Sequence, residues 1–151
     1  MEVPKKLTRT MKKLAAAGEE TVMIVPALLH SLSTQRMLAM SRIGADDNQK
    51  IFGYLVVTDK AVHYVMPGAL WDKVRTVPLE KIDEIQYLDE FHNNTLKLVS
   101  GKTSENIVFY DDREGISFYR HIKSQILSRE RESSNIESWK EESRNKESSN
   151  E

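Results

Sequence analysis

The sequence of 151 residues contains no cysteine, so it forms neither a disulfide nor a thiolate metal site, and a reducing cytoplasm is the simpler location. No apolar run approaches the roughly 20 residues that a helix needs to cross a bilayer. The N-terminus carries basic residues but lacks the continuous apolar core of a signal peptide. Together these absences favour a soluble intracellular protein, and the length suits one domain.

Strong charge of one sign and catalytic motifs are also missing. The 22 basic residues nearly balance the 23 acidic ones, so the composition does not indicate a nucleic-acid partner. No glycine-rich phosphate loop is present, and the four histidines share no metal-ligand spacing. His63 lies between Val62 and Tyr64 in a predicted strand, where a structural role is the better interpretation. We therefore predict a protein that is not an enzyme and that binds no metal or other cofactor.

Residues 1–18 are predicted to form a basic amphipathic helix, starting near Pro4 and ending before Gly18. An apolar stripe recurs at helical spacing, at Val3, Leu7, Met11 and Leu14. Basic side chains lie on or near the opposite side, at Lys5, Arg9, Lys12 and Lys13. Two interpretations stay open. The helix touches anionic lipid or an acidic partner, or it packs on its own domain with its lysines in water.

Residues 19–128 read as several short strands followed by one helix, which is typical of an antiparallel sandwich or barrel. The clearest hairpin joins Gly53–Thr58 to Ala61–Met66, and the Asp59 side chain is expected to accept a hydrogen bond within the turn. Further strands are predicted at Thr21–Leu29, Lys73–Val77, Ile82–Glu90, Thr95–Val99 and Thr103–Tyr110. Pro26 requires an edge or a bulge in its strand. Residues 31–50 fit either a short helix or a long loop.

The closing helix is predicted to begin with Asp111 near its cap. Its apolar face, interpreted as core, is formed by Phe118, Tyr119, Ile122 and Ile126. Beyond Ser128 the composition turns polar, with Ile136 and Trp139 as the large apolar residues. Residues 129–151 are therefore predicted to be a disordered polar tail or a frayed helical extension. Ile136 with Trp139, three residues apart, forms a weak docking motif.

Two short phrases in this order of elements carry a family resemblance. GYLVVTDK at Gly53–Lys60 is a hairpin, and PLEKI at Pro78–Ile82 is a turn that leads into the next strand. They resemble bacterial pleckstrin-homology-like domains, in particular the YokE-like group of Gram-positive bacteria and their phages, over roughly Leu14 to Leu127. The resemblance implies a mainly β fold with α. Such a fold is a bent antiparallel barrel of about seven strands capped by a C-terminal helix, with Leu79 and Ile82 facing the core.

The resemblance says less about a ligand. Eukaryotic relatives of the family often bind phosphoinositides with basic residues in the first strand–strand loop. Here that region offers Arg36 and Arg42 but also Asp46–Asp47, instead of the several converging donors that phosphate binding needs. Bacterial members are mostly described as domains of unknown function or as assembly modules. The sequence therefore departs from the inositide-binding pattern.

The leading functional hypothesis is a non-catalytic binding module for protein–protein interaction or self-assembly. Its candidate partner-binding residues are Leu70 and Trp71 in an unusually apolar connection, and Met37 and Met40, since methionine adapts to irregular surfaces. Trp71 is alternatively a lid over the barrel core. The second hypothesis is a peripheral membrane or lipid-binding domain that makes a weak anionic contact through the lysines and the arginine of the first helix.

Overall fold

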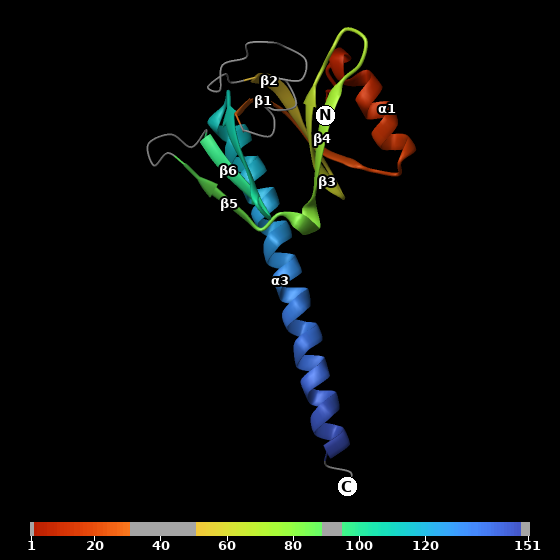
Figure 1. Cartoon of the computed structure of the whole chain (residues 1–151), viewed down its shortest axis with the longest axis vertical. Coiled ribbons are helices and arrows are strands. Elements are labelled where there is room, and N and C mark those ends of the chain that lie inside the picture. Colours follow the sequence, from red (N-terminus) through yellow and green to blue (C-terminus); the bar gives the residue numbers. More distant parts are fainter. Residues whose placement is uncertain (1, 31–50, 89–94, 149–151) are drawn as a thin grey trace.

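The computed structural model describes residues 2–30, 51–88 and 95–148. A short 3₁₀ helix, η1 (Lys5–Leu7), leads into α1 (Thr8–Ala16). The strands are β1 (Thr21–His30), β2 (Ile51–Thr58), β3 (Ala61–Met66), β4 (Lys73–Pro78), β5 (Glu84–Tyr87), β6 (Thr95–Ser100) and β7 (Thr103–Phe109). A second 3₁₀ helix, η2 (Leu79–Lys81), joins β4 to β5, and the long helix α3 (Asp112–Ser148) follows β7 (Figure 1).

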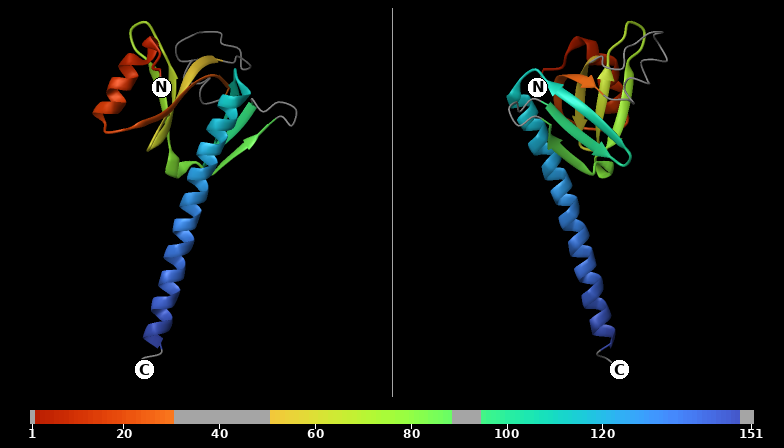
Figure 2. Two further views of the ribbon diagram at one scale, coloured as in Figure 1. Left: turned by 180° about the vertical axis from the view of Figure 1, so that it is seen from behind. Right: turned by 60° about the vertical axis from the view of Figure 1, so that its left-hand side comes forward.

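The seven strands form one antiparallel sheet in the order β4-β3-β2-β1-β7-β6-β5. β1 is shared between two halves, because it pairs with β2 along most of its length and with β7 only over residues 27–30. The sheet bends at this strand and wraps around the first part of α3 (Figures 1 and 2). Pro26 directly precedes the β7-paired stretch, so it lies where β1 has a free edge on that side. The expected bent barrel capped by a C-terminal helix is confirmed.

The main core fills the inside of the bent sheet. Leu55 and Val57 on β2 face it opposite Tyr64 and Val62 on β3, as the alternation of the predicted hairpin requires. Ile82 is fully buried in the core, and Leu79 packs partly against it. The predicted strand at 82–90 is corrected at its start, because residues 79–81 form η2 and β5 begins at Glu84.

A second apolar cluster lies on the outer face of the sheet, under α1. Leu7 and Leu14 pack there against Val56 and Val65, with Met11 partly buried beside them. Every residue of β3 is buried, because Val62 and Tyr64 face the main core while Val65 on the other face packs under α1 and His63 packs against Glu19 and Thr76. The apolar stripe of the first helix therefore packs on its own domain, as the second of the two interpretations expects. Val3 is the exception, because it is exposed.

The β2–β3 turn differs from the expectation in one hydrogen bond. The Asp59 carboxylate accepts from the Glu20 backbone N–H at 2.8 Å, so it ties the turn to the start of β1. Within the turn itself, the Thr58 hydroxyl oxygen accepts from the backbone N–H groups of Lys60 and Ala61 at 3.2 and 3.1 Å. Threonine precedes the turn and can make this local bond, so it takes the role that was assigned to Asp59.

α3 begins as predicted, with Asp111 Oδ1 accepting from the Arg113 N–H at 2.9 Å. Phe118, Ile122 and Ile126 are buried in the main core and close one end of the barrel. Arg129 is the last side chain of the helix that is not exposed, and its guanidinium donates to the backbone carbonyls of Leu79, Glu80 and Ile82. This cationic fork satisfies carbonyls of η2 and of the residue that follows it.

Beyond Arg129, the structure continues α3 as helix to Ser148, which agrees with the helical extension, the second of the two alternatives for residues 129–151 (Figure 2). Residues 130–147 bury nothing against the domain. Their helical state has a local cause. The segment is rich in glutamate, lysine and arginine, which have good helix propensity, and several opposite charges are spaced at three or four residues. These local preferences favour the helical state of the segment.

Candidate binding surface

The β3–β4 loop presents two apolar side chains to solvent. Leu70 is 78% exposed and Trp71 is 64% exposed, so Trp71 does not cover the barrel core as a lid. Gly68 shapes the loop, because a Cβ at this position would lie 2.2 Å from the Trp71 carbonyl oxygen. Only glycine permits that approach. The chain therefore turns tightly at Gly68 and carries Leu70 and Trp71 outward.

Helix α1 holds this loop through Arg9 and Thr10. The Arg9 guanidinium donates to the carbonyls of Gly68 and Leu70, and it lies 3.1 Å from Asp72 Oδ1. The Thr10 hydroxyl donates to Asp72 Oδ2 at 2.7 Å. We call this set (Arg9, Thr10, Gly68, Leu70 and Asp72) the loop clamp. It fixes both the backbone of the loop and its distance from α1.

The Asp72 carboxylate is the centre of the loop clamp. Burial alone would raise the pKa of Asp72, but hydrogen bonds from Thr10, Gly68 and Arg9, together with the Arg9 charge, hold it below its ordinary value. The group is therefore ionised at neutral pH. The negative charge of Asp72 pairs with Arg9, so Asp72 does not neutralise the lysines of α1.

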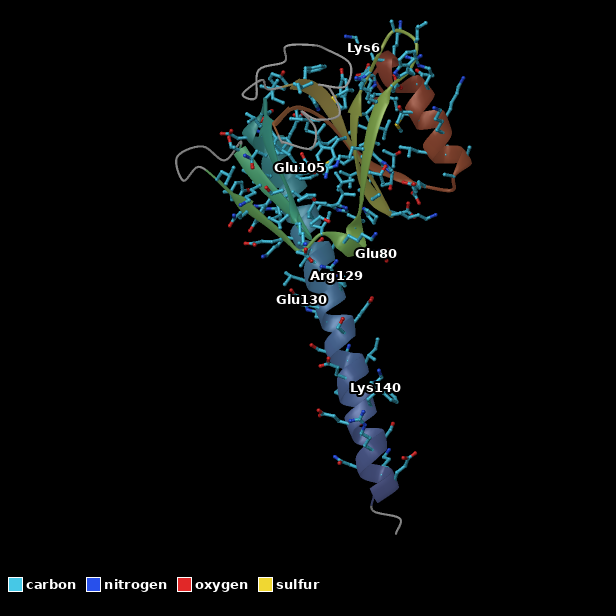
Figure 3. All side chains as sticks on the ribbon, viewed as in Figure 1. Lys6, Glu80, Glu105, Arg129, Glu130 and Lys140 are labelled. Atoms are coloured by element: carbon cyan, nitrogen blue, oxygen red, sulfur yellow. The ribbon has the colours of Figure 1, made fainter. Side chains whose placement is uncertain are left out.

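The four predicted membrane-binding residues consequently separate into two roles. Arg9 is engaged in the loop clamp, whereas Lys5, Lys12 and Lys13 are exposed. Lys6 was not among the predicted residues. It lines a hollow with Lys5, Arg9, Pro67 and Gly68, directly beside the loop (Figure 3). The sequence signal for Lys6 is its position next to Lys5 in the same run of basic residues.

The predicted candidates thus fall partly together. The β3–β4 loop that carries Leu70 and Trp71 lies beside α1, to which Arg9 bonds it, so the apolar candidate and the basic candidate are neighbours (Figure 1). We call the exposed side chains Lys5, Lys6, Leu70 and Trp71 the loop–helix surface. Met37 and Met40 lie outside the described residues, as do the basic and acidic residues between β1 and β2.

Buried His63 belongs to a hydrogen-bond network inside the domain. His63 Nε2 donates to Glu19 Oε2 at 2.7 Å, and His63 Nδ1 lies 2.8 Å from Thr76 Oγ1. The Thr58 hydroxyl donates to the same Glu19 oxygen at 2.6 Å. Burial alone would raise the pKa of Glu19, but the bonds from Thr58 and His63 hold it below its ordinary value. This network joins the start of β1 to β2, β3 and β4.

A second internal ion pair links Arg75 on β4 to Glu105 on β7, next to the ring of Tyr64. Burial raises the pKa of the Tyr64 hydroxyl, so it stays protonated. Within the described ranges, no group of three or more histidine, aspartate or glutamate side chains is arranged to hold a metal ion. None of the helices described is long and apolar enough to cross a membrane.

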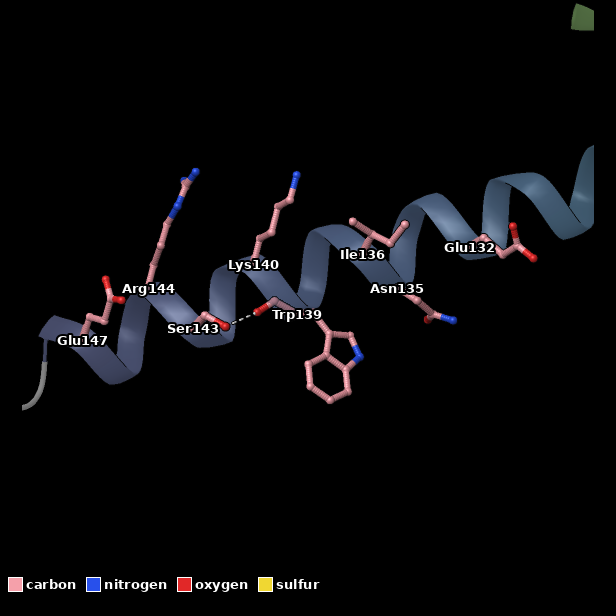
Figure 4. Close-up of a pocket in the computed structure, with 8 residues that line it drawn as sticks. All are labelled: Glu132, Asn135, Ile136, Trp139, Lys140, Ser143, Arg144 and Glu147. Carbon is pink, nitrogen blue, oxygen red and sulfur yellow. Dashed lines mark hydrogen bonds between the residues drawn. The ribbon is translucent and has the colours of Figure 1, made fainter. Parts of the chain in front are cut away.

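The projecting part of α3 carries two further exposed apolar residues. Ile136 and Trp139 are exposed, and they lie on a helix surface with Glu132, Lys140 and other polar side chains (Figure 4). All residues of this surface come from one helix, so it is an open face and encloses no ligand.

Comparison with known proteins supports the fold and leaves the ligand open. No protein-family model matches the sequence, and no curated protein matches it. The chain is similar to the DH/PH domains of p115-RhoGEF (R399E mutant), with a TM-score of 0.55 and 9% identity, over 84% of this chain and 36% of that one. For the DH/PH fragment of PDZRHOGEF in complex with human RhoA, the TM-score is 0.55 at 7% identity, over 83% of this chain and 34% of that one.

A third similar structure is the C-terminal domain of an unknown protein from Leishmania infantum. Its TM-score is 0.52 at 14% identity, over 79% of this chain and 95% of that one. The chain thus spans only 34–36% of the two RhoGEF chains but nearly all of the isolated domain. At these identities the similarity shows architecture alone. The chain has a pleckstrin-homology-like fold: a bent seven-stranded antiparallel sheet with an N-terminal helix outside it and a C-terminal helix closing its core.

Proposed function

We propose that this domain is a non-catalytic protein-interaction or self-assembly module that docks through the loop–helix surface. The observation that supports this most strongly is the exposure of Leu70 and Trp71 on a loop whose backbone is held by the loop clamp. An exposed tryptophan beside a leucine costs free energy in water unless a partner covers it. Tryptophan is also enriched among residues that dominate interface affinity.

The loop clamp makes this surface suitable for binding. A loop that is already ordered in the free protein loses little conformational entropy when a partner covers it. Lys5 and Lys6 lie beside Pro67 and Gly68 at the start of the same loop, and charged residues typically form the solvated rim of an interface. The chemistry of the proposed partner follows: a protein surface with an apolar pocket for Trp71 and acidic side chains opposite the two lysines.

Binding is preferred over catalysis for a chemical reason. Burial is the first cause of the raised pKa values of Tyr64, Tyr87 and Glu114 and of the lowered pKa of His121, whereas partners inside the domain hold the pKa values of Glu19 and Asp72 below their ordinary values. His63 is buried between Glu19 and Thr76, so it cannot reach a substrate without unfolding of that network.

A second candidate function is peripheral contact with an anionic membrane. The specific observation is that residues 3–17 contain five basic residues and no acidic one, and that Lys5 and Lys6 lie beside Pro67 and Gly68 of the loop that carries an exposed leucine and tryptophan. Lysines near anionic lipid each contribute about 1 kcal/mol, and a tryptophan is well placed at the headgroup level. The two functions use the same surface but differ in their dependence on salt.

Two binding assays separate these functions. The full chain is sedimented with phosphatidylcholine vesicles and with vesicles that also contain phosphatidylserine, and in parallel it is used to capture proteins from an extract of the source organism. The protein-interaction proposal expects specific partners that are lost with Trp71→Ala and no sedimentation with either vesicle. Sedimentation only with phosphatidylserine, abolished by salt and by Lys5→Glu/Lys6→Glu, would replace it with the membrane function.

A matched control keeps the result interpretable. Lys123→Glu reverses a lysine charge on α3, away from the loop–helix surface, and is expected to leave either form of binding unchanged.

The same proposal includes a family and a location. The Gly53–Lys60 and Pro78–Ile82 phrases support membership of the YokE-like group, and the location proposed is the cytoplasm.

A further inference from the structure

The projecting half of α3 is an isolated helix that ends far from the domain (Figures 1 and 2). Its exposed segment, residues 130–147, is about 27 Å long at 1.5 Å per residue. A single polar helix in water is marginally stable by itself, and most helices in proteins are stabilised by packing one face. This segment has one face that is suited to packing, and we call it the Ile136 face.

The Ile136 face has a simple pattern. Ile136 stands at its centre, Glu132 lies one turn before it, and Lys140 lies one turn after it. Trp139 is next to this row and points to the neighbouring side (Figure 4). Ile136 is 56% exposed and Trp139 is 72% exposed, so both are available to a partner. Such a face has an apolar centre with a negative charge on one side and a positive charge on the other. It is complementary to a surface that carries the same groups in the reverse order.

That complement is the same face of a second copy. In an antiparallel pair with Ile136 at the two-fold axis, the residue one turn before the axis lies level with the residue one turn after it. Glu132 of each copy then lies level with Lys140 of the other, so both charge pairs are attractive. In a parallel pair in register, Glu132 would meet Glu132 and Lys140 would meet Lys140. The charges therefore favour the antiparallel arrangement and oppose the parallel one.

We propose that two copies of this chain associate through their projecting α3 segments, antiparallel, with Ile136 on the two-fold axis. The two Trp139 indoles lie on either side of the axis and extend the apolar contact. Arg129 is already bound to the carbonyls around η2, so the pairing segment begins just after it. This association uses a surface separate from the loop–helix surface, and either proposal stands if the other fails.

Charge reversal in the full chain tests the pairing by sedimentation equilibrium at low salt. The wild-type chain is expected to dimerise, and Glu132→Lys or Lys140→Glu alone to weaken the dimer at least about tenfold, since each places like charges level on both sides of the axis. The double variant Glu132→Lys/Lys140→Glu is expected to restore the wild-type constant. Glu132 and Lys140 are two turns apart in one helix, so this rescue cannot arise within a single copy.

Two further variants complete the experiment. Ile136→Lys places two like charges at the axis and is expected to abolish the dimer, whereas Trp71→Ala is expected to leave it unchanged. Circular dichroism of each variant checks that the barrel remains folded, which is expected because the altered side chains are exposed. A wild-type chain that stays monomeric, or single reversals that change nothing, or a double variant without rescue, would each overturn the proposal.

Discussion

Replacing Asp72 with alanine removes the centre of the loop clamp. The Asp72 side chain accepts from Thr10 Oγ1 at 2.7 Å and from the Gly68 N–H at 3.3 Å, and it lies 3.1 Å from Arg9. In Asp72→Ala the Thr10 hydroxyl loses this acceptor, although Thr10 is only 3% exposed. The Arg9 guanidinium loses its counter-charge, but its side chain is 45% exposed and water can solvate it.

The magnitude follows from these two exposures. A buried hydroxyl left without its partner costs about 1–3 kcal/mol of stability. The partly exposed Arg9–Asp72 pair adds about 0.2–1 kcal/mol, as surface ion pairs do. Asp72→Ala is therefore expected to lower the free energy of unfolding by about 1–4 kcal/mol. Asp72→Asn keeps the size and one acceptor oxygen, so it is expected to lose less than Asp72→Ala.

Urea titration followed by circular dichroism measures these changes. Glu84→Ala removes an exposed carboxylate from β5 and serves as the control, with an expected change of no more than about 0.5 kcal/mol. A double-mutant cycle with Arg9→Ala isolates the coupling between the two residues. If Asp72→Ala lost no more stability than Glu84→Ala, the loop clamp would not hold the loop, and the preorganisation argued for the loop–helix surface would be wrong.

Three further results are expected. Ile122→Ala should lower the free energy of unfolding by about 2–5 kcal/mol because Ile122 is fully buried, whereas exposed Arg120→Ala should change it by at most about 0.5 kcal/mol in the same titration. Limited proteolysis should remove the part of α3 after Arg129 and leave a stable domain, and a chain that also lacks Arg129 should melt lower because carbonyls around η2 lose their donor. Asp72 and Glu19 have pKa values below their ordinary 3.8 and 4.5, so the unfolded chain binds protons first as the pH falls. Acid titration of the melting temperature should therefore show stability that is full above these values and declines below them, less steeply in Asp72→Asn.

The elements that could be predicted from sequence are those whose signal is local. The β2–β3 hairpin alternates core-facing apolar residues and has a two-residue polar turn, so its faces and its turn followed directly, although β2 begins at Ile51, two residues before the predicted start. The apolar stripe of α3 likewise placed Ile122 and Ile126 in the core. The tail was harder, because its polar composition excludes a core but does not exclude an exposed helix, and its glutamates and lysines favour one.

The binding surface could be predicted only in part, since it depends on contacts between distant residues. Leu70 and Trp71 were recognisable as part of an apolar connection. The sequence alone does not distinguish a Trp71 that covers the core from a Trp71 that is exposed at the tip of the loop. The difference arises from the loop clamp, in which Arg9 reaches Asp72 across 63 positions of the chain. No local pattern in α1 distinguishes Arg9 from the neighbouring lysines. Its planar fork spreads donors over two nitrogens that contact two carbonyls and a carboxylate at once, a geometry that the compact ammonium of lysine does not offer.

The central claim is that Trp71 anchors a partner on a domain that folds without it. The most direct test compares the melting temperature of Trp71→Ala with its binding to a partner protein captured by the wild-type chain, measured by pull-down under conditions where both proteins are folded. We expect a melting temperature close to that of the wild-type chain, because Trp71 is mostly exposed, together with association weakened by at least about 2 kcal/mol. A stable variant whose association is undiminished would contradict the claim and remove Trp71 from the binding surface.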